Sequence, residues 1–345
     1  MKKLVIFNLQ TDPSSPILGF TLDWIKGFQS HFLVTDVVST HVGERLNLGK
    51  VRILKLGGGN TLSRIMAFLK LFKFALGLIP KRNEYYVFHH MSPRTAVFHG
   101  ILFKLFGIPQ ALWYSHHAKP VSLRVAVHIV DQIFSSEKNS FPIVSNRAHF
   151  VGHGIPLSKF MKVNPIDERS NEILFLGRIS PVKKLDNLLK EVSLLQRKLP
   201  VVIVGSSTNK DYVEKLRNES SSMEITLTIY GPVNYEQVQS VMKKYKYFYS
   251  GMQNSVDKSA LEAAISGCFV LCTDEGTQGL SGMTRVWDAL QTKIPETIHK
   301  QIEVLESVED NQVPILRELL QIESRQRNDL DKTIFEISMI MKSEK

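Results

Sequence analysis

The sequence predicts an α/β protein built from two doubly wound domains. Short runs rich in β-branched and aromatic residues alternate with runs of helical length throughout the 345 residues, a pattern typical of βα units with parallel sheets. A polar segment with a proline, Ser158–Glu172, interrupts the alternation near the middle, as a linker would. We therefore expect Rossmann-like domains at 1–160 and 161–327. We expect a C-terminal helix, 328–345, to pack back on the first domain.

The strands of the first domain are expected at 4–9, 32–39, 51–56, 85–90, 110–117 and 132–137, with helices at 21–29, 62–78, 93–106 and around Leu123. The second domain is expected to have strands at 172–177, 200–207, 225–231, 247–252 and 268–273, with helices starting near Lys184, Asp211, Tyr235 and Ser259 and a helical end after Met283. Two such domains leave a cleft at the carboxyl ends of their strands, where ligands bind.

Positive charge is concentrated in the first half of the chain. Residues 1–159 contain 19 Lys and Arg against 7 Asp and Glu, a net charge of +12, whereas the remainder has 24 against 26, or −2. Such an asymmetry indicates an anionic partner for the first domain. No helix-turn-helix, zinc-finger or aromatic–basic pattern accompanies it, so nucleic acid is not the expected partner.

The expected helix at 61–79 is almost wholly apolar apart from Arg64, Lys70 and Lys73. Its composition allows two interpretations: a helix buried against the first sheet, or a helix that contacts an anionic membrane surface. No secretory signal and no membrane-spanning run is apparent. Cys268 and Cys272 are too far apart on one strand to form a disulfide, so we expect a cytoplasmic protein, either free or at the cytoplasmic face of the membrane.

A basic turn follows the first strand of the second domain. The sequence ILFLGRISPVKKLDNLL (Ile173–Leu189) is a strand, a short turn and an amphipathic helix. Gly177 permits close backbone approach to a ligand, while Arg178 and Lys183 are suited to a diphosphate. Phosphate is held at such turns because the helix N-terminus also attracts anions.

A second stretch, DKSALEAAISGCFVL (Asp257–Leu271), is a helix carrying Glu262 followed by a buried strand. A carboxylate on such a helix can accept hydrogen bonds from ribose hydroxyls. Gly205 and Gly231 follow two further strands, at turns where a base or ribose could lie. The chain lacks the dinucleotide fingerprint and the P-loop motif, which argues against dinucleotide oxidoreductases and P-loop NTPases.

Histidines end two strands of the first domain, as the pairs His89–His90 and His116–His117. Adjacent residues of a strand point to opposite faces, so at most one of each pair is expected to face the cleft. No accompanying ligand pattern supports a metal site, and hydrogen bonding to a sugar or an acceptor is the expected role.

These stretches together resemble the GT-B glycosyltransferases of family 4, the glycosyl transferases group 1. The element Ser250–Ala263 (SGMQNSVDKSALEA), and segments such as VFHHMSP and LWYSHHAKPVSLRVA, are similar to bacterial members that build cell-surface polysaccharides and glycolipids. The similarity extends from about Tyr85 to Asp274. One departure is clear, because Asn254 occupies the position of the first glutamate in the family's acidic E-x7-E motif.

The resemblance implies transfer of a sugar from a nucleotide diphosphate sugar, with retention of configuration and without a metal or other cofactor. Arg178 and Lys183 would hold the diphosphate and Glu262 the ribose. Asp257 or Asn254 would contact the donor sugar, and His116 or His117 would reach toward it. The acceptor would be a cell-surface polysaccharide, lipopolysaccharide or glycolipid.

Two alternatives remain at this stage. A nucleotide-sugar epimerase or phosphorylase would share the fold but match these motifs less well. A catalytically degenerate subunit would bind the nucleotide sugar and support a partner transferase, as the missing glutamate at Asn254 allows. Donor binding without turnover would distinguish that subunit from an enzyme.

Overall fold

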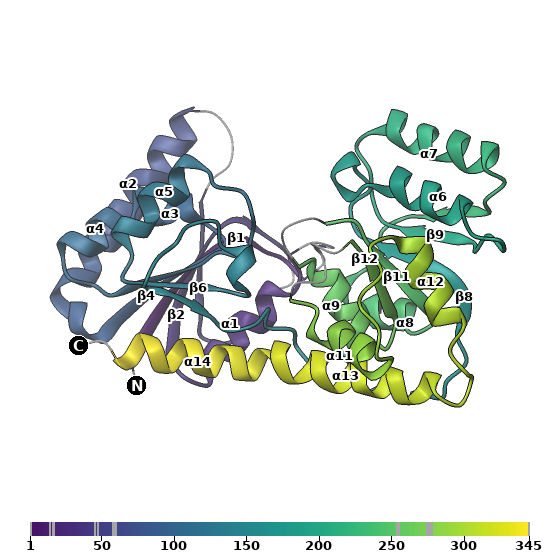
Figure 1. The fold of residues 1–345 in the computed structure, drawn as a ribbon. Coiled ribbons are helices and arrows are strands. Elements are labelled where there is room, and N and C mark those ends of the chain that lie inside the picture. The colour runs from purple at the N-terminus through teal and green to yellow at the C-terminus, as the bar shows by residue number, and fades with distance from the viewer. Residues whose placement is uncertain are drawn as a thin grey trace. The chain divides into compact units, whose positions relative to one another are not determined.

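The computed structural model describes residues 2–13, 15, 18–44, 46, 48–56, 61–252, 256–273 and 279–343. The chain divides into two compact units (Figure 1). Unit 1 is Met1–Pro156 with Asp329–Lys345, and unit 2 is Leu157–Asn328. These boundaries lie within four residues of those expected from the linker and the final helix.

Unit 1 contains a parallel seven-stranded sheet in the order β3-β2-β1-β4-β5-β6-β7. Its strands are β1 (Lys3–Thr11), β2 (Leu33–Val42), β3 (Arg52–Lys55), β4 (Tyr85–His90), β5 (Gln110–Trp113), β6 (Gln132–Ser135) and β7 (Ala148–Phe150). Its helices are α1 (Thr21–Gln29), α2 (Thr61–Leu78), α3 (Pro93–Phe98), α4 (Gly100–Leu105), α5 (Val121–Ile129) and α14 (Leu330–Ser343), with short helical turns η1 (Ile79–Glu84) and η2 (Lys138–Ser140).

Alternate residues of the strands in unit 1 build two cores, one on each face of the sheet. Leu4 and Ile6 of β1 pack with α1 and α14, whereas Val5 and Phe7 face α2 and α4. The helices α2 to α5 therefore cover one face, and α1 and α14 the other (Figure 1). The final helix belongs to this unit because its apolar side packs on α1.

Unit 2 contains a parallel five-stranded sheet in the order β10-β9-β8-β11-β12. Its strands are β8 (Ser170–Leu176), β9 (Val201–Val204), β10 (Leu227–Tyr230), β11 (Tyr245–Ser250) and β12 (Phe269–Cys272). Its helices are α6 (Leu185–Ser193), α7 (Lys210–Ser222), α8 (Val238–Met242), α9 (Lys258–Ile265), α11 (Ser281–Ala289), α12 (Ile298–Glu306) and α13 (Val313–Asn328), with turns η3 (Pro181–Lys183) and η4 (Tyr235–Gln237).

Both sheets have the strand order of doubly wound folds, so the α/β fold class predicted from the sequence is confirmed. In each sheet the chain starts in the middle, moves to one edge and then returns to the other side of the first strand. The order reverses between β1 and β4 in unit 1 and between β8 and β11 in unit 2. Such a switch point, at the carboxyl ends of the strands, is where ligands of open α/β sheets bind.

Some local predictions were wrong. The helix expected at 93–106 is broken into α3 and α4 at His99, whose buried ring stacks on Phe7 with ring centroids 5.6 Å apart. The strand expected at 110–117 ends at Trp113, because the His116 N–H bonds to the Ser140 carbonyl oxygen instead of a neighbouring strand. The short strand β7 was not expected at all.

The two cysteines of unit 2 are both free and buried. Burial raises the pKa of the Cys268 thiol to about 11, so it stays protonated near neutral pH. Both are packing residues.

Candidate functional site at the switch point of unit 2

The two stretches singled out in the sequence meet at the switch point of unit 2. The first follows β8 and contains Gly177, Arg178 and η3. The second follows β11 and leads into α9, whose N-terminal flanking residue is Asp257. Because β8 and β11 are neighbouring parallel strands, their carboxyl ends bring the two stretches to one edge of the sheet. The N-terminal end of α9, the positive end of its dipole, lies there as well.

An ion pair joins the two stretches directly. Lys183 Nζ donates a hydrogen bond to Asp257 Oδ2. The side chains are 15% and 18% exposed, so the pair is accessible to a ligand yet partly shielded from solvent. Asp257 uses its carboxylate for this lysine rather than to cap α9. Arg178, in contrast, is exposed.

Glycines end four adjacent strands at this edge: Gly177 after β8, Gly205 after β9, Gly231 after β10 and Gly251 after β11. A Cβ on Gly205 would lie 1.8 Å from the carbonyl oxygen of Gly177, and one on Gly251 would lie 2.1 Å from that of Lys183. Side chains cannot fit at either position, so the backbone at the switch point is packed against itself. Gly231 is different, because a Cβ there would contact nothing within 4 Å.

Glu262 lies on α9 and is 4% exposed. Its Oε1 accepts a hydrogen bond from the Tyr235 hydroxyl at 2.8 Å and forms an ion pair with Lys258 Nζ at 3.2 Å. Lys258 also donates to the Tyr235 oxygen at 3.0 Å. These contacts fix the carboxylate through one oxygen. Tyr235 was not expected from the sequence, because it comes from η4, 27 residues away.

Two tyrosines hydrogen-bond to the backbone of the turn between β8 and α6. Lys184 has left-handed backbone angles, φ 50° and ψ 43°, and its carbonyl oxygen accepts from the Tyr249 hydroxyl at 2.8 Å. The Leu185 N–H donates to the Tyr212 oxygen at 3.1 Å. Burial, together with the neighbouring Asp186, raises the pKa of Tyr212 to about 12. Both phenols therefore stay protonated and keep the basic turn in place.

Asn254 lies outside the described residues. The remaining predicted residues of the second domain, Gly177, Arg178, Lys183, Gly205, Gly231, Asp257 and Glu262, lie at the ends of strands of one sheet or on the adjoining helix α9. Gly251 belongs with them but was missed. Its signal in the sequence is a fourth strand followed directly by glycine.

The predicted histidines lie in unit 1. The rings of His116 and His117 stack with centroids 4.4 Å apart, so the prediction that they point to opposite faces was wrong. They follow β5 in a turn in which His116 Nδ1 accepts from the Ala118 N–H at 2.9 Å. His117 is exposed and His116 is half-buried.

The other histidine pair is buried, so neither member is available to the ligand role expected for such histidines. His89 is fully buried, with its ring nitrogens 3.0 Å from the Thr95 hydroxyl and 3.3 Å from Gln110 Oε1. Burial lowers its pKa to about 3. His90 is 3% exposed and lies against Trp24 and Phe20. Among the described residues no His, Cys, Asp and Glu side chains gather as a metal site would require.

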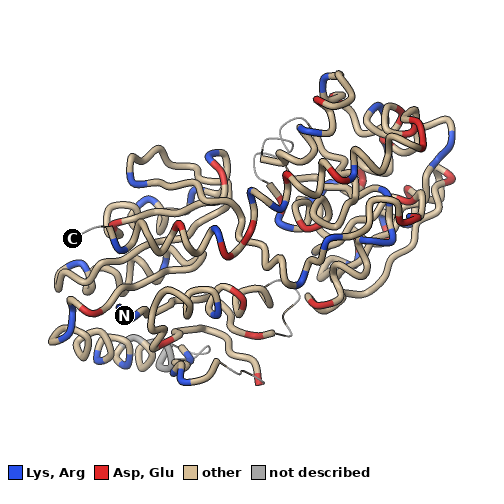
Figure 2. Tube along the Cα trace, turned by 90° about the horizontal axis from the view of Figure 1, so that it is seen from below, with Lys and Arg blue, Asp and Glu red and all other residues tan. Residues whose placement is uncertain are grey.

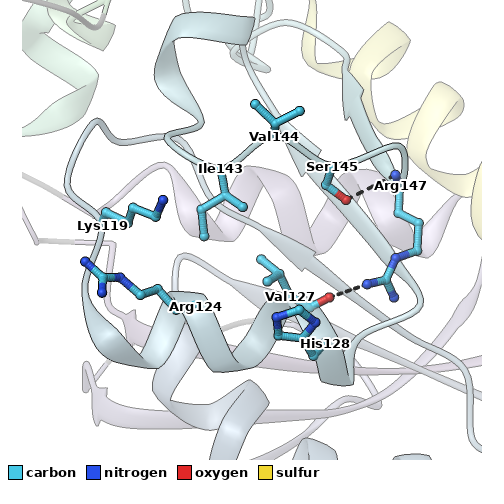
Figure 3. A pocket seen from close by; sticks show the side chains of 8 residues that line it. All are labelled: Lys119, Arg124, Val127, His128, Ile143, Val144, Ser145 and Arg147. Carbon is cyan, nitrogen blue, oxygen red and sulfur yellow. Dashed lines mark hydrogen bonds between the residues drawn. The ribbon is translucent and has the colours of Figure 1, made fainter.

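Unit 1 has a cavity of about 440 Å³ between α5 and the segment that leads into β7 (Figure 3). Lys119 and Arg124 stand on one side of it. On the other side Arg147 is held by the carbonyl oxygens of Val127 and Val130. Its cations suit an anion, and Lys119 follows the predicted His117 by two residues.

Comparison with known proteins supports the sequence resemblance. Residues 158–320 match the family model "Glycosyl transferases group 1". A search of curated protein sequences gives no match. The predicted resemblance is thus confirmed over most of unit 2.

Solved structures of glycosyltransferases share the fold over 99% of this chain. Anabaena Alr3699/HepE in complex with UDP has a TM-score of 0.73 at 14% identity and is covered completely. Sucrose-phosphate synthase from Thermosynechococcus elongatus has a TM-score of 0.76 at 11% identity, with 99% covered. The lipopolysaccharide outer core galactosyltransferase WaaB has a TM-score of 0.66 at 14% identity, with 99% covered. The protein therefore has the GT-B fold, and most of its unit 2 matches the model of the group 1 glycosyl transferases.

Proposed function

We propose that this protein transfers a sugar from a nucleoside diphosphate sugar to a cell-surface polysaccharide, lipopolysaccharide or glycolipid acceptor. The observation that carries the proposal is the meeting of the GRISPVK and DKSALEA stretches at the switch point of unit 2, joined by the Lys183–Asp257 pair. Uridine is the first base to test, since Alr3699/HepE has been crystallised with UDP and with UDP-glucose.

In this proposal the basic turn holds the diphosphate. Charge develops on the phosphate as the glycosidic bond breaks, so cations placed there stabilise the transition state. Arg178 supplies a planar fork of donors and Lys183 a compact second charge. The two together neutralise the leaving group without a metal ion.

The donor's ribose would bind Glu262. Tyr235 and Lys258 already bond to Oε1, which leaves Oε2 to accept from ribose hydroxyls. Asp257 or Asn254 would contact the donor sugar. We propose retention of configuration, as the family resemblance implies.

The acceptor would bind unit 1, with His116 or His117 reaching toward the donor sugar. A lipid-linked acceptor fits the excess of basic residues in this part of the chain, and WaaB, which shares the fold, is a lipopolysaccharide galactosyltransferase. We propose that unit 1 contacts an anionic membrane surface on the cytoplasmic side. Within the described residues none of the helices combines the length and apolarity needed to cross a bilayer.

Thermal unfolding with UDP, ADP, GDP and their glucose conjugates tests the donor site. We expect one nucleotide to raise Tm, and Arg178→Ala to abolish that rise while leaving the Tm without ligand unchanged. Arg197→Ala is the matched control, because Arg197 is also exposed in unit 2 but precedes the amino end of β9, away from the carboxyl ends of the strands. The donor assignment fails if no nucleotide binds or if the two variants respond alike.

The degenerate-subunit alternative predicts the same nucleotide binding without turnover. Release of UDP from the bound nucleotide sugar, measured with a membrane fraction as acceptor source, separates the two. Binding that Arg178→Ala abolishes, with no UDP release above that variant's rate, would favour the subunit.

A further inference from the structure

The cavity of Figure 3 is a groove that runs along α5 in unit 1. Its volume of about 440 Å³ lies within the range of small-molecule sites. One wall is the helix itself, where Arg124, Val127 and His128 share a face because they are three and four residues apart. The other wall is the segment 143–147, which leads into β7, and Lys119 stands before the start of the helix. None of the eight described residues that line the groove is acidic.

The turn before Lys119 fixes the start of the groove. The Tyr114 hydroxyl donates to the Ala118 carbonyl oxygen at 2.8 Å, and the Ala118 N–H donates to His116 Nδ1 at 2.9 Å. The opposite wall is fixed as well, because Arg147 donates to two carbonyl oxygens at the end of α5. A groove whose two walls are already held in place loses little conformational freedom when a ligand binds.

No carboxylate neutralises the positive charge of the groove. Within the described part of the chain no ion pair is found for Lys119, Arg124 or Arg147. The carbonyl partners of Arg147 carry no net charge, so its positive charge remains. Residues 61–130 contain nine Lys and Arg and a single acidic residue, Glu84, whereas both signs of charge are interspersed along unit 2 (Figure 2). A concave site with one sign of charge concentrates ligands of the opposite sign.

The groove suits a larger ligand than a simple ion. Figure 3 shows Lys119 and Arg124 together at one end and His128 and Arg147 together at the other, with Ile143 between the two ends. The Arg124 guanidinium offers a planar pair of donors that matches a phosphate or a carboxylate. The apolar Ile143 suits the C–H face of a sugar ring, whose hydroxyls can bond to polar groups at either end. Apolar contact with a few polar groups is the usual make-up of a small-molecule site.

We propose that this groove binds an acidic sugar of the acceptor glycan, with its phosphate or carboxylate on Lys119 and Arg124 and its ring against Ile143. The inference rests on the proposed function and narrows the acceptor to an anionic glycan. His117, proposed there to reach toward the donor sugar, lies two residues before Lys119 and is exposed like it. Two residues span at most about 7 Å, so one short glycan can contact both side chains.

Calorimetric titration of the full chain at low salt tests the groove with four probes: glucose 6-phosphate, glucuronate, glucose and inorganic phosphate. At least one of the two acidic sugars should bind. Glucose and inorganic phosphate should each bind about tenfold more weakly than that sugar, or not at all, because each supplies only one part of the ligand.

Two double variants locate the binding. Lys119→Gln/Arg124→Gln should weaken binding of the acidic sugar about tenfold or more, since both charged donors are lost. Its Tm should not change, because both side chains are exposed. The matched control is Lys70→Gln/Lys73→Gln, which removes the same charge from exposed positions of α2 in the same unit and should leave the affinity unchanged.

Equal losses in the two double variants would overturn the specific site, because diffuse attraction would then suffice. Inorganic phosphate that bound as tightly as the acidic sugar would overturn the sugar site and leave a groove for any small anion. Binding of neither acidic sugar would also refute the proposal. Titration of UDP separates this result from the donor site. A protein that binds the acidic sugar but not UDP refutes the donor assignment, and one that binds UDP but neither acidic sugar refutes the groove alone.

Discussion

Packing of backbone against backbone at the switch point makes Gly205→Ala the sharpest test of the site. The new Cβ would lie 1.8 Å from the Gly177 carbonyl oxygen. Contacts below 3.0 Å essentially do not occur at Cβ atoms, so the turn after β8 must move by at least 3.0 − 1.8 = 1.2 Å. The displaced group is backbone and cannot rotate away as a side chain could.

The expected cost is at the upper end of that for overpacking, about 3 kcal/mol. For a unit of this size each kcal/mol lowers Tm by roughly 2–4 °C, so we expect a decrease of about 6–12 °C. Arg178 follows Gly177 directly, so its position must change as well. We expect UDP affinity to fall about tenfold or more, since misplaced groups lose much of their binding contribution.

Gly231→Ala is the matched control. Gly231 ends the neighbouring strand β10, and its Cβ would have nothing within 4 Å. Calorimetry of both variants, with titration of UDP, makes the comparison. If Gly205→Ala matched Gly231→Ala in both Tm and UDP affinity, the close approach of the two turns would not organise the site.

Three further predictions concern the scaffold. Burial holds the pKa of His89 at about 3 in the folded state, against about 6.5 in the unfolded chain, so the unfolded state binds more protons between these values and stability falls as pH falls. From about pH 7 to about pH 5 this costs about 2 kcal/mol. In denaturant titrations His89→Gln should lose this pH dependence of the unfolding free energy, and an unchanged dependence would contradict the assignment. Deleting residues 329–345 removes four core side chains of α14, whose burial is worth about 2 kcal/mol each, so amide exchange should rise throughout unit 1 and not in unit 2. Tyr235→Phe removes one hydrogen bond to Glu262 and should lower stability by about 1 kcal/mol while weakening UDP binding; unaltered UDP binding would separate Glu262 from the nucleotide.

The sequence predicted the fold class and most elements because buried parallel strands and helices leave strong local patterns. It also singled out the two stretches that meet at the switch point of unit 2, since a glycine, two cations and a helix carboxylate are local in sequence. The contact of Gly251 with Lys183 and the Tyr235–Glu262 bond join residues 68 and 27 positions apart. No local pattern reveals such pairs.

The prediction that His116 and His117 point to opposite faces failed for a local physical reason. The rule that adjacent residues face opposite sides applies only inside a strand, and β5 ends before His116. For α2 the composition could not separate the side that packs on the sheet from the exposed side, because both carry apolar residues. Only the position of Leu71, Ala75 and Leu78 against the sheet distinguishes them.

The Lys183–Asp257 pair places a condition on the donor site. Lys183 is proposed to hold the diphosphate and Asp257 is a candidate for the donor sugar, yet in the structure the two side chains form an ion pair with each other. A diphosphate carries more charge than one carboxylate and can draw the lysine toward itself. The carboxylate would then be released at the moment when the sugar needs a hydrogen-bond acceptor. With Asn254 lacking a carboxylate, we expect this exchange to supply the acidic group that the family's first glutamate provides elsewhere.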